Sequence, residues 1–590
     1  MSTKSLSTLL WDSMQSQASA RRQFGYVANQ ELSYAQLVKT IKKLSGFFAQ
    51  HSIERIAIVC TDECYTAEIM LAALLNGVVF TVLDGDIKQP RFDGIIQRFK
   101  PDHIFVDEMS ALTVSTEFTI TSKAKPSSIL SNLFGQSQNN QCYPYILKHY
   151  QACVPNVVHN NTQAYVLFTS GTTSKPKGVM ISVQALASHL ATLKQVYQYS
   201  QHSHILNALQ LSHADGLVQG PILAAYLGIK WSHLGQFDIA NAESIFDHIV
   251  AQEVTHFITV PVVLALLNKY GPSDDAFSGD IFYCVVSTGG ALSAQLWQSF
   301  EQKYATKVSN LYGLTETCVG GVFTTVGDAE NSYGRIGRPV DMQYALGSPF
   351  EPQELNEGLL WLSGDNIMDG YLDAPKETVK VLVDGWLNTG DIAKRHEDGS
   401  LSIIGREKEL INAGGYAVYP QEINESLCSH PDVENAYTTS RIDDLYGEYI
   451  VSLVATSMSG SEPIIAHVRS TLEAHKVPRS IYITDKLPLG PSGKVIKASA
   501  EALIDEKQPQ IEVAASQDED KLLAIAAKIF NLQQTELSIS SSSQNTPGWD
   551  SLGHLMLVTE AEEQFGVQLT PIEIMKATSL QQLLALIISK

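Results

Sequence analysis

The sequence predicts an α/β fold: a large amino-terminal domain of two α/β sheets plus a small barrel, then a small α+β domain and a helical bundle. Up to about residue 400, runs of β-branched residues alternate with helical stretches, as in largely buried sheets with helices between the strands. The runs are RIAIVC at 55–60, DHIFV at 102–106, AYVLFTS at 164–170, HFITV at 256–260 and FYCVVSTGG at 282–290, and the helical stretches include YTAEIMLAALL at 65–75 and AQLWQSFEQKY at 294–304.

Shorter elements follow. GLLWLSG at 358–364, DGWLNTGD at 384–391 and GSLSIIG at 399–405 predict the small barrel or an antiparallel sheet. Beyond them we expect helices at 420–430 and 462–476 and a strand at 449–456. Residues 502–518 have no clear period and predict a linker, and 519–590 repeat apolar residues at helical spacing. The predicted parts are 1–406, 407–501, 502–518 and 519–590.

Composition narrows the class of function. The chain of 590 residues has 62 acidic and 41 basic side chains, a net charge of −21 that argues against nucleic acid or an anionic membrane as a partner. Its 7 cysteines form no CxxC pair, so we expect reduced thiols and no zinc site. The amino terminus lacks a signal peptide's apolar core, and Asn76 and Gly77 interrupt the most apolar run. We therefore expect a soluble, cytoplasmic protein.

The segment YVLFTSGTTSKPKGVMIS at 165–182 predicts a phosphate-binding loop. Backbone N–H groups that can approach closely, hydroxyl donors and a mobile cation are what a polyphosphate needs. The spacing differs from GxxxxGK[ST], so a P-loop nucleotidase is not supported. The loop residues that offer such groups are Thr169, Ser170, Gly171, Thr172, Thr173 and Lys177.

This loop resembles the [ST]SGTTGxPKG signature of the adenylate-forming enzymes: acyl-CoA synthetases, firefly luciferase and the adenylation domains of nonribosomal peptide synthetases. Ser174 stands where glycine is usual. Other segments resemble family motifs in the family's order. They are LSYAQL at 32–37, LLNGVVFTVLD at 74–84, STGGALS at 287–293, NLYGLTET at 310–317, LNTGDIA at 387–393, GREKELINAGGYAVYPQEIN at 405–424 and LPLGPSGKV at 487–495.

The resemblance implies adenylation of a carboxylic acid with ATP and Mg²⁺, with release of pyrophosphate. This reaction joins two anions and so needs cations. Glu316 would hold Mg²⁺, and Lys494, assisted by Lys177, would be the main catalytic residue, bridging the carboxylate and the α-phosphate. Besides the loop, the resemblance assigns the nucleotide to Gly290, Ala291, Asn310, Tyr312, Gly313, Thr315, Asp391 and Arg406.

Within that set, Tyr312 would stack on the adenine, and Asp391 and Arg406 would bind the ribose. Members of the family rotate the small domain between adenylation and thioester formation. The matching hinge residue is Lys408, and the glycines 414–415 would approach the pantetheine arm, because glycine permits close backbone contact.

The tail resembles acyl and peptidyl carrier proteins, which are four-helix bundles. TPGWDSLGHLMLVTEAEEQFGVQL at 546–569 matches their attachment region, with Gly548-Trp549 in place of the commoner residues before Asp550. Ser551 would carry covalent 4'-phosphopantetheine, since a phosphodiester is favoured where a helix starts.

Pocket positions identified by resemblance are Ala214, Asp215, Val218, Val286, Thr288, Gly289, Leu311, Val319 and Gly320, and His213 would border the pocket and shield the adenylate. In amino-acid-activating relatives an aspartate at the position of Ala214 pairs with the substrate α-ammonium. A buried ammonium without it would be costly, so ordinary α-amino acids are disfavoured. Two readings stay open: Asp215 points away and the acid is unaminated, or Asp215 pairs with a displaced amine, as in a β-amino acid.

The expected activity is loading of the acid onto the chain's own carrier domain for nonribosomal-peptide, polyketide-type or related acyl transfer. A small carboxylic acid would be the substrate, and a phosphopantetheinyl transferase and a downstream acyl acceptor enzyme would be partners. One alternative is an acyl-CoA ligase that releases acyl-CoA, with the tail as an accessory. The other is an inactive scaffold that displays the carrier domain.

Overall fold

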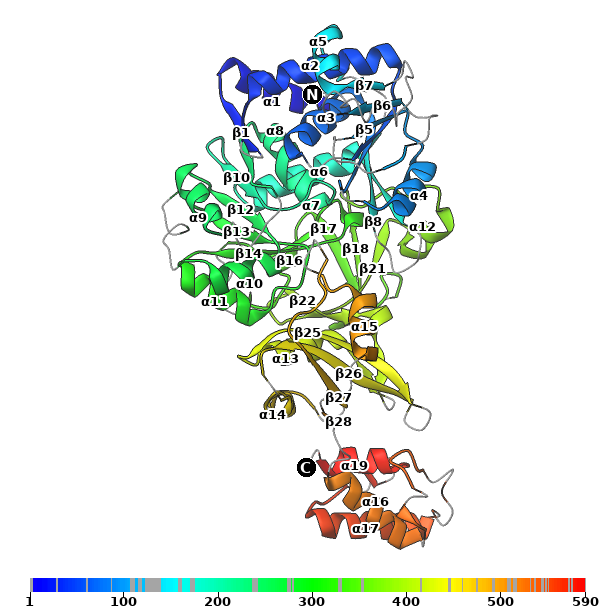
Figure 1. Ribbon diagram of the computed structural model, residues 1–590. Helices are drawn as coiled ribbons and strands as arrows, with labels where there is room; N and C mark the ends of the chain where they lie inside the picture. The colour runs from blue at the N-terminus through cyan, green and yellow to red at the C-terminus, as the bar shows by residue number, and fades with distance from the viewer. Residues whose placement is uncertain are drawn as a thin grey trace. The chain divides into compact units, whose positions relative to one another are not determined.

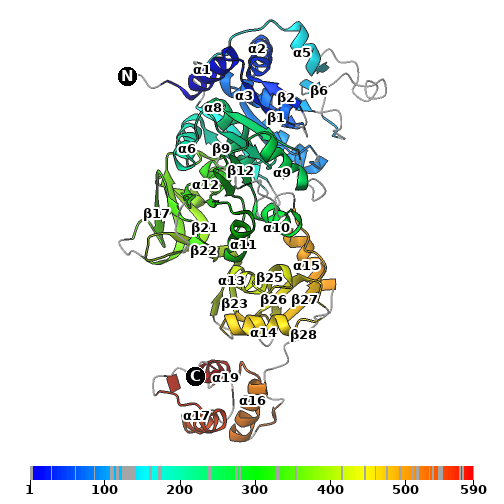
Figure 2. The ribbon, with the colours of Figure 1, turned by 90° about the vertical axis from the view of Figure 1, so that its left-hand side faces the viewer.

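The chain forms two compact units, one of residues 1–389 and 393–403 and the other of residues 390–392 and 404–590. Figures 1 and 2 show their elements. The computed structural model describes residues 4–588 except 28–29, 60–61, 86, 107–111, 115–118, 123–139, 158–161, 170–175, 236–241, 273–276, 278–280, 327–331, 352–354, 414–415, 444–446, 459, 474–475, 491–493, 507–510, 513–516, 531, 535–536, 543–545, 547–548, 550, 571–572 and 575–576.

The first unit contains an eight-stranded sheet with order β19-β9-β8-β4-β3-β5-β6-β7. Strand β3 is parallel to β4 and to β5, and β8 is antiparallel to β9. All five residues of β4 are buried, as expected for a parallel strand covered on both faces. The strands are β3 (Arg55–Val59), β4 (Val79–Leu83), β5 (His103–Val106), β6 (Thr119–Ser122), β7 (Asn140–Cys142), β8 (Gln163–Thr169), β9 (Lys177–Ser182) and β19 (Gly370–Tyr371).

A second, nine-stranded sheet has the order β16-β15-β14-β13-β12-β10-β11-β1-β2. The run from β1 to β14 is parallel throughout. The two large sheets confirm the predicted α/β architecture. The strands are β1 (Gln23–Val27), β2 (Gln30–Ser33), β10 (His204–Asn207), β11 (Lys230–His233), β12 (His256–Thr259), β13 (Cys284–Ser287), β14 (Val308–Tyr312), β15 (Val322–Phe323) and β16 (Arg338–Pro339).

Helices cover both faces of the second sheet. On one face α9 (Ala242–Ala251), α10 (Pro261–Tyr270) and α11 (Ala294–Tyr304) pack around Phe257 and Val285, and Figure 1 shows them in green beside β12–β14. On the other face the core of the unit includes side chains from α1 (Leu6–Ser19), α6 (Val183–Val196) and α8 (Leu223–Leu227), together with Ile258 and Val286. This second face carries the predicted acyl pocket.

The remaining helices of the unit follow local sequence signals. Ser33 and Gln36 form a capping box before α2, and Gly77, with φ +69°, ends α3. The elements are α2 (Tyr34–His51), α3 (Glu63–Asn76), α4 (Gln89–Phe99), α5 (Tyr143–His149), α7 (Ala214–Leu217), the π-helix η2 (Val218–Ile222), the 3₁₀-helix η4 (Thr315–Thr317) and α12 (Pro375–Val381).

The region expected as a small barrel or antiparallel sheet is a five-stranded sheet. Its order is β17-β18-β21-β20, with β22 paired to β21. The pairs β17–β18 and β20–β21 are antiparallel. The strands are β17 (Met342–Leu346), β18 (Glu357–Gly364), β20 (Leu382–Val383), β21 (Trp386–Arg395) and β22 (Leu401–Arg406).

After the 3₁₀-helix η6 (Glu407–Glu409), the second unit begins with a small α+β domain. Its main sheet has the order β25-β26-β27-β28, and β23 pairs with β24. The helix expected at 462–476 is shorter and ends at Thr471. The elements are β23 (Ile411–Ala413), β24 (Tyr416–Val418), α13 (Pro420–Cys428), β25 (Val433–Asp443), β26 (Gly447–Thr456), α14 (Glu462–Thr471), β27 (Ser480–Thr484), α15 (Lys497–Glu506) and β28 (Ile511–Glu512).

The stretch predicted as a linker, 502–518, is partly structured. Residues 502–506 continue α15, and β28 adds a fourth strand to the small sheet. Ala500 and Ile504, four residues apart, are both buried, so one apolar helix face extends past the predicted boundary.

The tail forms a helical bundle with its own core, shown in orange and red in Figures 1 and 2. The helices are α16 (Gln517–Phe530), α17 (Ser551–Phe565) and α19 (Leu580–Ile588). Their apolar faces meet around Leu522, Leu557 and Leu583, which are each 0% exposed. The core explains the three-and-four spacing of apolar residues in the sequence.

Two expectations from composition can be compared with the described residues. Among the helices that the structure describes, none is both long enough and apolar enough to cross a membrane. Cys153, Cys284, Cys318 and Cys428 are free thiols, as expected for reduced cysteines.

Candidate active site

The predicted phosphate loop lies between two paired strands. Thr169, the last residue of β8, is the partner of Lys177, the first residue of β9. Gly178 is required here because a Cβ atom would lie 2.9 Å from Val166 Cγ1. The intervening Ser170, Gly171, Thr172 and Thr173 lie outside the described residues.

Lys177 belongs to a cluster that also contains Tyr371 and Glu316. The Lys177 Nζ lies 4.8 Å from the centre of the Tyr371 ring, and the Tyr371 hydroxyl donates a 2.8 Å hydrogen bond to Glu316 Oε1. Burial, and then the negative charge of Glu316, raise the pKa of Tyr371 well above its usual range. The phenol therefore keeps its proton and acts as a donor that orients the carboxylate.

Glu316 fits the predicted magnesium ligand. It lies in η4, half-buried, and its backbone oxygen accepts a 2.8 Å hydrogen bond from Met368 N. No group of three or more His, Cys, Asp or Glu side chains suited to a metal occurs in the described part of the chain. Mg²⁺ does not require such a cage, because proteins commonly hold it by one or two carboxylates plus substrate phosphates.

The predicted adenine segments lie at the ends of two neighbouring parallel strands. Ser287 of β13 pairs with Asn310 of β14, so the residues that follow each strand emerge at the same sheet edge. Asn310 is buried and donates from Nδ2 to Arg335 O at 2.9 Å. The other predicted residues here are Gly289 and Tyr312, which are half-buried, Gly290 and Ala291, which are exposed, and Gly313 and Thr315, which are half-buried.

Gly313 permits a close approach of backbone at this edge. A Cβ atom there would lie 2.1 Å from Gly320 Cα and 2.2 Å from Val319 O. No side chain fits that space, so any substitution would separate the adenine segment from the predicted acyl pocket.

The predicted ribose residues, Asp391 and Arg406, are brought together. They lie on the paired strands β21 and β22, with Arg406 Nε 2.8 Å from Asp391 Oδ1. The carboxylate is 3% exposed and the guanidinium 52% exposed. The arginine thus places a positive charge beside a buried carboxylate.

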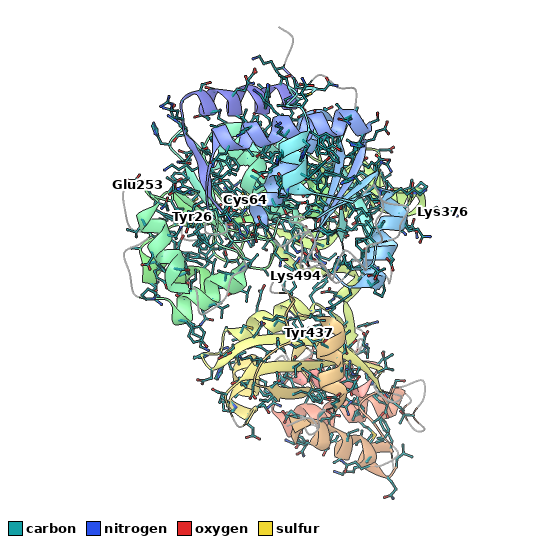
Figure 3. All side chains as sticks on the ribbon, turned by 45° about the horizontal axis from the view of Figure 1, so that its top comes forward. Tyr26, Cys64, Glu253, Lys376, Tyr437 and Lys494 are labelled. Atoms are coloured by element: carbon teal, nitrogen blue, oxygen red, sulfur yellow. The ribbon has the colours of Figure 1, made fainter. Side chains whose placement is uncertain are left out.

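Lys408 and Lys494 both belong to the second unit and both are exposed. Lys494 follows a turn in which Gly490 N donates to Lys494 O and Ile496 N donates to Pro488 O, each at 2.8 Å. Val495 packs in the same apolar cluster as Tyr437, and Figure 3 labels both Lys494 and Tyr437 in the small domain. The glycines 414–415 lie outside the described residues.

Most predicted acyl-pocket residues share one apolar core. It contains Ala214, Val218, Val286, Leu311 and Val319, each at most 5% exposed. His213, by contrast, is exposed at the start of α7, where its side chain makes no capping hydrogen bond. The pocket positions therefore come together from α7, η2, β13, β14 and the segment after η4.

Asp215 is the charged side chain among the predicted pocket positions. Asp215 Oδ1 accepts hydrogen bonds from Thr288 Oγ1 at 2.7 Å and from Gln219 Nε2 at 3.1 Å. Thr288 is itself a predicted pocket residue, so Asp215 is hydrogen-bonded to another of the pocket positions, and both readings of the acid stay predictions. Gln219 was not among the residues predicted to line the pocket.

Sequence reasoning also missed Tyr371. Both missed residues act through partners far along the chain: Tyr371 contacts Glu316, and Gln219 completes the Asp215–Thr288 pair. The sequence pair Gly370–Tyr371 does not by itself predict a contact with Glu316. Gln219 had one cue, a polar residue four positions after Asp215 in an otherwise apolar helical stretch.

Ser551 is the first residue of α17, as expected for an attachment site at a helix start. Its side chain and Asp550 lie outside the described residues. Trp549, the unusual residue before them, is buried, and its ring stacks on Phe530 with centroids 5.0 Å apart. The departure from the commoner attachment sequence thus supplies a core residue of the bundle.

The structure also has a surface hollow of about 420 Å³. It is lined by Leu9, Ser13, Lys194, Tyr199, Ser200, Gln201, Tyr226 and Leu227. None of these is a predicted site residue, so the strand ends described above, and not this hollow, form the candidate site.

Family comparisons match the chain in three consecutive regions. The model for AMP-binding enzymes matches residues 12–372, more than half of the chain. The model for the AMP-binding enzyme C-terminal domain matches residues 422–494, and that for the phosphopantetheine attachment site matches 520–587. Each match lies inside one of the predicted domains.

Individual relatives agree with this order. The chain is 26% identical to indoleacetate–CoA ligase of Aromatoleum aromaticum over 490 residues, which are 81% of this chain and 94% of the relative. It is 30% identical to oxalate–CoA ligase of Arabidopsis thaliana over 350 residues, 58% of this chain and 67% of the relative. The crystal structure of ATP-bound MatB from Rhodopseudomonas palustris shares the fold with a TM-score of 0.74 at 21% identity, covering 85% of this chain and 99% of that one.

Proposed function

Since the chain belongs to the AMP-binding enzyme family, it is an ATP-dependent acid–thiol ligase, and we propose that it loads a carboxylic acid onto its own carrier domain. It uses ATP, Mg²⁺ and 4'-phosphopantetheine. The observation that carries the proposal is the phosphopantetheine attachment domain on the same chain as the ligase domains. A tethered thiol has a high effective concentration, so it competes well with free coenzyme A.

The described residues fit the first step. Adenylation forms a bond between a carboxylate oxygen and the α-phosphorus of ATP and breaks the bond to pyrophosphate. By the family resemblance, we assign the offset of the charge of the two anions to Lys177 and Lys494. Glu316 is the proposed protein ligand of Mg²⁺, and Asp391, held by Arg406 at 2.8 Å, accepts the ribose hydroxyls.

In the second step the acyl group moves from the adenylate to the carrier. The phosphopantetheine arm supplies the thiol that takes the acyl group as AMP leaves. We assign attachment to Ser551, rotation of the small domain to the hinge at Lys408, and shielding of the adenylate to His213. A carrier domain in general implies a phosphopantetheinyl transferase and a downstream acceptor. A pathway of the nonribosomal-peptide or polyketide type is part of the proposal.

A second candidate is release of the product as acyl-CoA, with the tail as an accessory. The observation in its favour is that the relatives reported above are CoA ligases. An inactive scaffold is excluded by the enzyme class.

For the substrate, we propose a carboxylic acid without an α-amino group. Ala214 occupies the position at which amino-acid-activating relatives carry the pairing aspartate, and the surrounding core is apolar. An α-ammonium buried there would lack its counter-charge. An unaminated acid and a β-amino acid both remain compatible with this pocket.

The Tyr371 hydroxyl gives a first test of the magnesium site. Tyr371→Phe removes the 2.8 Å donor to Glu316 and keeps the ring beside Lys177. A hydrogen bond to a charged group contributes about 1.5–3 kcal/mol, so we expect the Mg²⁺ concentration for half-maximal pyrophosphate exchange to rise about tenfold or more. An unchanged magnesium requirement would contradict the assignment of Glu316. Tyr344→Phe, a half-buried tyrosine of β17, is the matched control.

Self-loading is tested by intact mass. Protein charged with phosphopantetheine is incubated with Mg·ATP and a panel of unaminated, β-amino and α-amino acids. We expect a mass gain equal to one acyl group, lost completely in Ser551→Ala. A gain that survives in Ser551→Ala would place the acceptor elsewhere. Formation of acyl-CoA with no loaded carrier would favour the second candidate.

A further inference from the structure

We propose that Gln219 and Asp215 together form an acceptor site for a hydrogen-bond donor on the acyl substrate, an amine or hydroxyl on the β-carbon or beyond. The inference rests on the proposed function, because it names the substrate class of the same acyl pocket. It makes Gln219 a specificity-determining residue for the adenylation step.

The orientation of Gln219 follows from hydrogen-bond chemistry. Its side chain lies in η2, is 0% exposed, and approaches Asp215 Oδ1 at 3.1 Å. An ionised carboxylate only accepts hydrogen bonds, so the amide nitrogen of Gln219 must face Asp215. Nε2 and Oε1 belong to one planar amide group, so Oε1 lies beside the Asp215–Thr288 pair.

Gln219 Oε1 is therefore an acceptor at the predicted pocket. It is buried and has no hydrogen-bond partner among the residues that the structure describes. Buried carbonyl oxygens are nearly always paired, and those that are not call for an explanation such as a bound group. A donor on the substrate would satisfy Oε1 and would lie within reach of the adjacent carboxylate.

The neighbouring residues make an apolar substrate a poor fit at this point. Val218 and Val286 belong to the same apolar core as Ala214, and their side chains supply no donor. The pKa of Cys318 is raised to about 12 by burial and also by the charge of Asp215, so the half-buried carboxylate lies close to this buried thiol. A plain alkyl group would leave the buried Gln219 Oε1 without a donor.

The position of the pair also selects where the donor is attached. Asp215 follows Ala214, which stands at the place of the ammonium-pairing aspartate of amino-acid-activating relatives. The acceptor pair is thus displaced from the α-ammonium position. A hydrogen-bond donor attached to the β-carbon, or farther from the substrate carboxylate, would match this displaced position. Both an ammonium and a hydroxyl group can donate the hydrogen bond.

The test uses three acids of nearly equal shape: 3-aminobutanoate, 3-hydroxybutanoate and 3-methylbutanoate. Their phenyl analogues, with an aromatic ring on the β-carbon, form a second set. ATP–pyrophosphate exchange with the full-length protein gives kcat/KM for each acid. We expect the amino or hydroxy acid of at least one set to exceed its methyl isostere at least tenfold. Within each set, comparison of the amino acid with the hydroxy acid distinguishes a site for an ammonium group from a site for a hydroxyl group.

Gln219→Met keeps the side-chain length and removes the amide. We expect it to lower the preference for the donor-bearing acid at least tenfold, while exchange with the methyl isostere reports that the protein is folded. Gln17→Met is the matched control, because Gln17 of α1 also has a buried Oε1 without a partner among the described residues but lies outside the site.

Two results would overturn the inference alone: a wild-type preference for the methyl isostere, or a donor preference that Gln219→Met leaves intact. Failure of all α-amino, β-substituted and unsubstituted acids to support exchange would instead overturn the proposed function, and the inference with it.

Discussion

Replacing Lys494 with alanine should lower the rate of adenylation roughly 10²–10³-fold, the usual effect of removing one preorganised charge-stabilising group from an active site. The turn that carries Lys494 is held by backbone hydrogen bonds, Gly490 N to Lys494 O and Ile496 N to Pro488 O, each at 2.8 Å. Neither bond uses the lysine side chain, so the turn should persist in the variant. Pyrophosphate exchange at saturating Mg·ATP and acid measures the effect.

Two controls separate catalysis from folding. Lys486→Ala removes another exposed lysine of the same unit and should leave the exchange rate within about twofold. Transfer from a synthetic acyl-adenylate to the charged carrier bypasses the bond that Lys494 helps to form, so Lys494→Ala should reduce this transfer far less than adenylation. An exchange rate in Lys494→Ala equal to that of the wild type would remove Lys494 from the mechanism.

Fold elements with strong local signals could be predicted closely. The helix read at 294–304 is α11 because Ser293 caps it at Leu296 N. The helix and the strand within the predicted linker at 502–518 have a tertiary cause. Arg441 binds Glu501 and Asp505 at 2.5 and 2.8 Å, and β28 pairs with β27. Those partners lie about 60 residues away along the chain. The spacing of apolar residues within a short segment therefore cannot predict the contacts.

The candidate site likewise contains residues that a local sequence pattern identifies and residues that no local pattern identifies. Motif residues such as Asp391, Arg406 and Glu316 could be assigned by resemblance, because their chemistry is tied to a contiguous pattern. Residues that orient them could not, since Tyr371 reaches Glu316 from a strand 55 positions away. The predicted acyl pocket gives a second example of this limit. Resemblance identified Asp215 as a pocket position, but only the contacts with Thr288 and Gln219 define which way its carboxylate faces.

Trp549→Ala should unfold the carrier domain and abolish its modification while leaving adenylation nearly intact. Trp549 is 4% exposed and stacks on Phe530 of α16 at 5.0 Å. Truncating a buried tryptophan to alanine costs about 3–5 kcal/mol. A bundle of this size has a total stability of only about 5–10 kcal/mol. The remaining margin would be small or absent.

A hydrogen-bond chain gives a structural role to this tryptophan, two residues before Ser551, the proposed attachment residue. Trp549 Nε1 donates to His554 Nδ1 at 3.1 Å, and His554 Nε2 donates to Ile574 O at 2.9 Å. Because a carbonyl only accepts, the proton of His554 is on Nε2, which leaves Nδ1 as the acceptor that the indole needs. The chain ties the start of α17 to the segment beyond it, and so fixes the helix end at which Ser551 lies.

The experiment follows phosphopantetheine transfer from coenzyme A by intact mass, with pyrophosphate exchange measured on the same sample. Trp549→Phe is the comparison variant: it keeps an aromatic ring against Phe530 but loses the indole donor and part of the buried ring, so we expect modification to continue with a smaller stability loss than in Trp549→Ala. Modification of Trp549→Ala at the wild-type rate would mean that the bundle tolerates the cavity. Loss of exchange along with modification would mean that the ligase domains depend on the carrier domain for their own folding, contrary to the separate core around Leu522, Leu557 and Leu583.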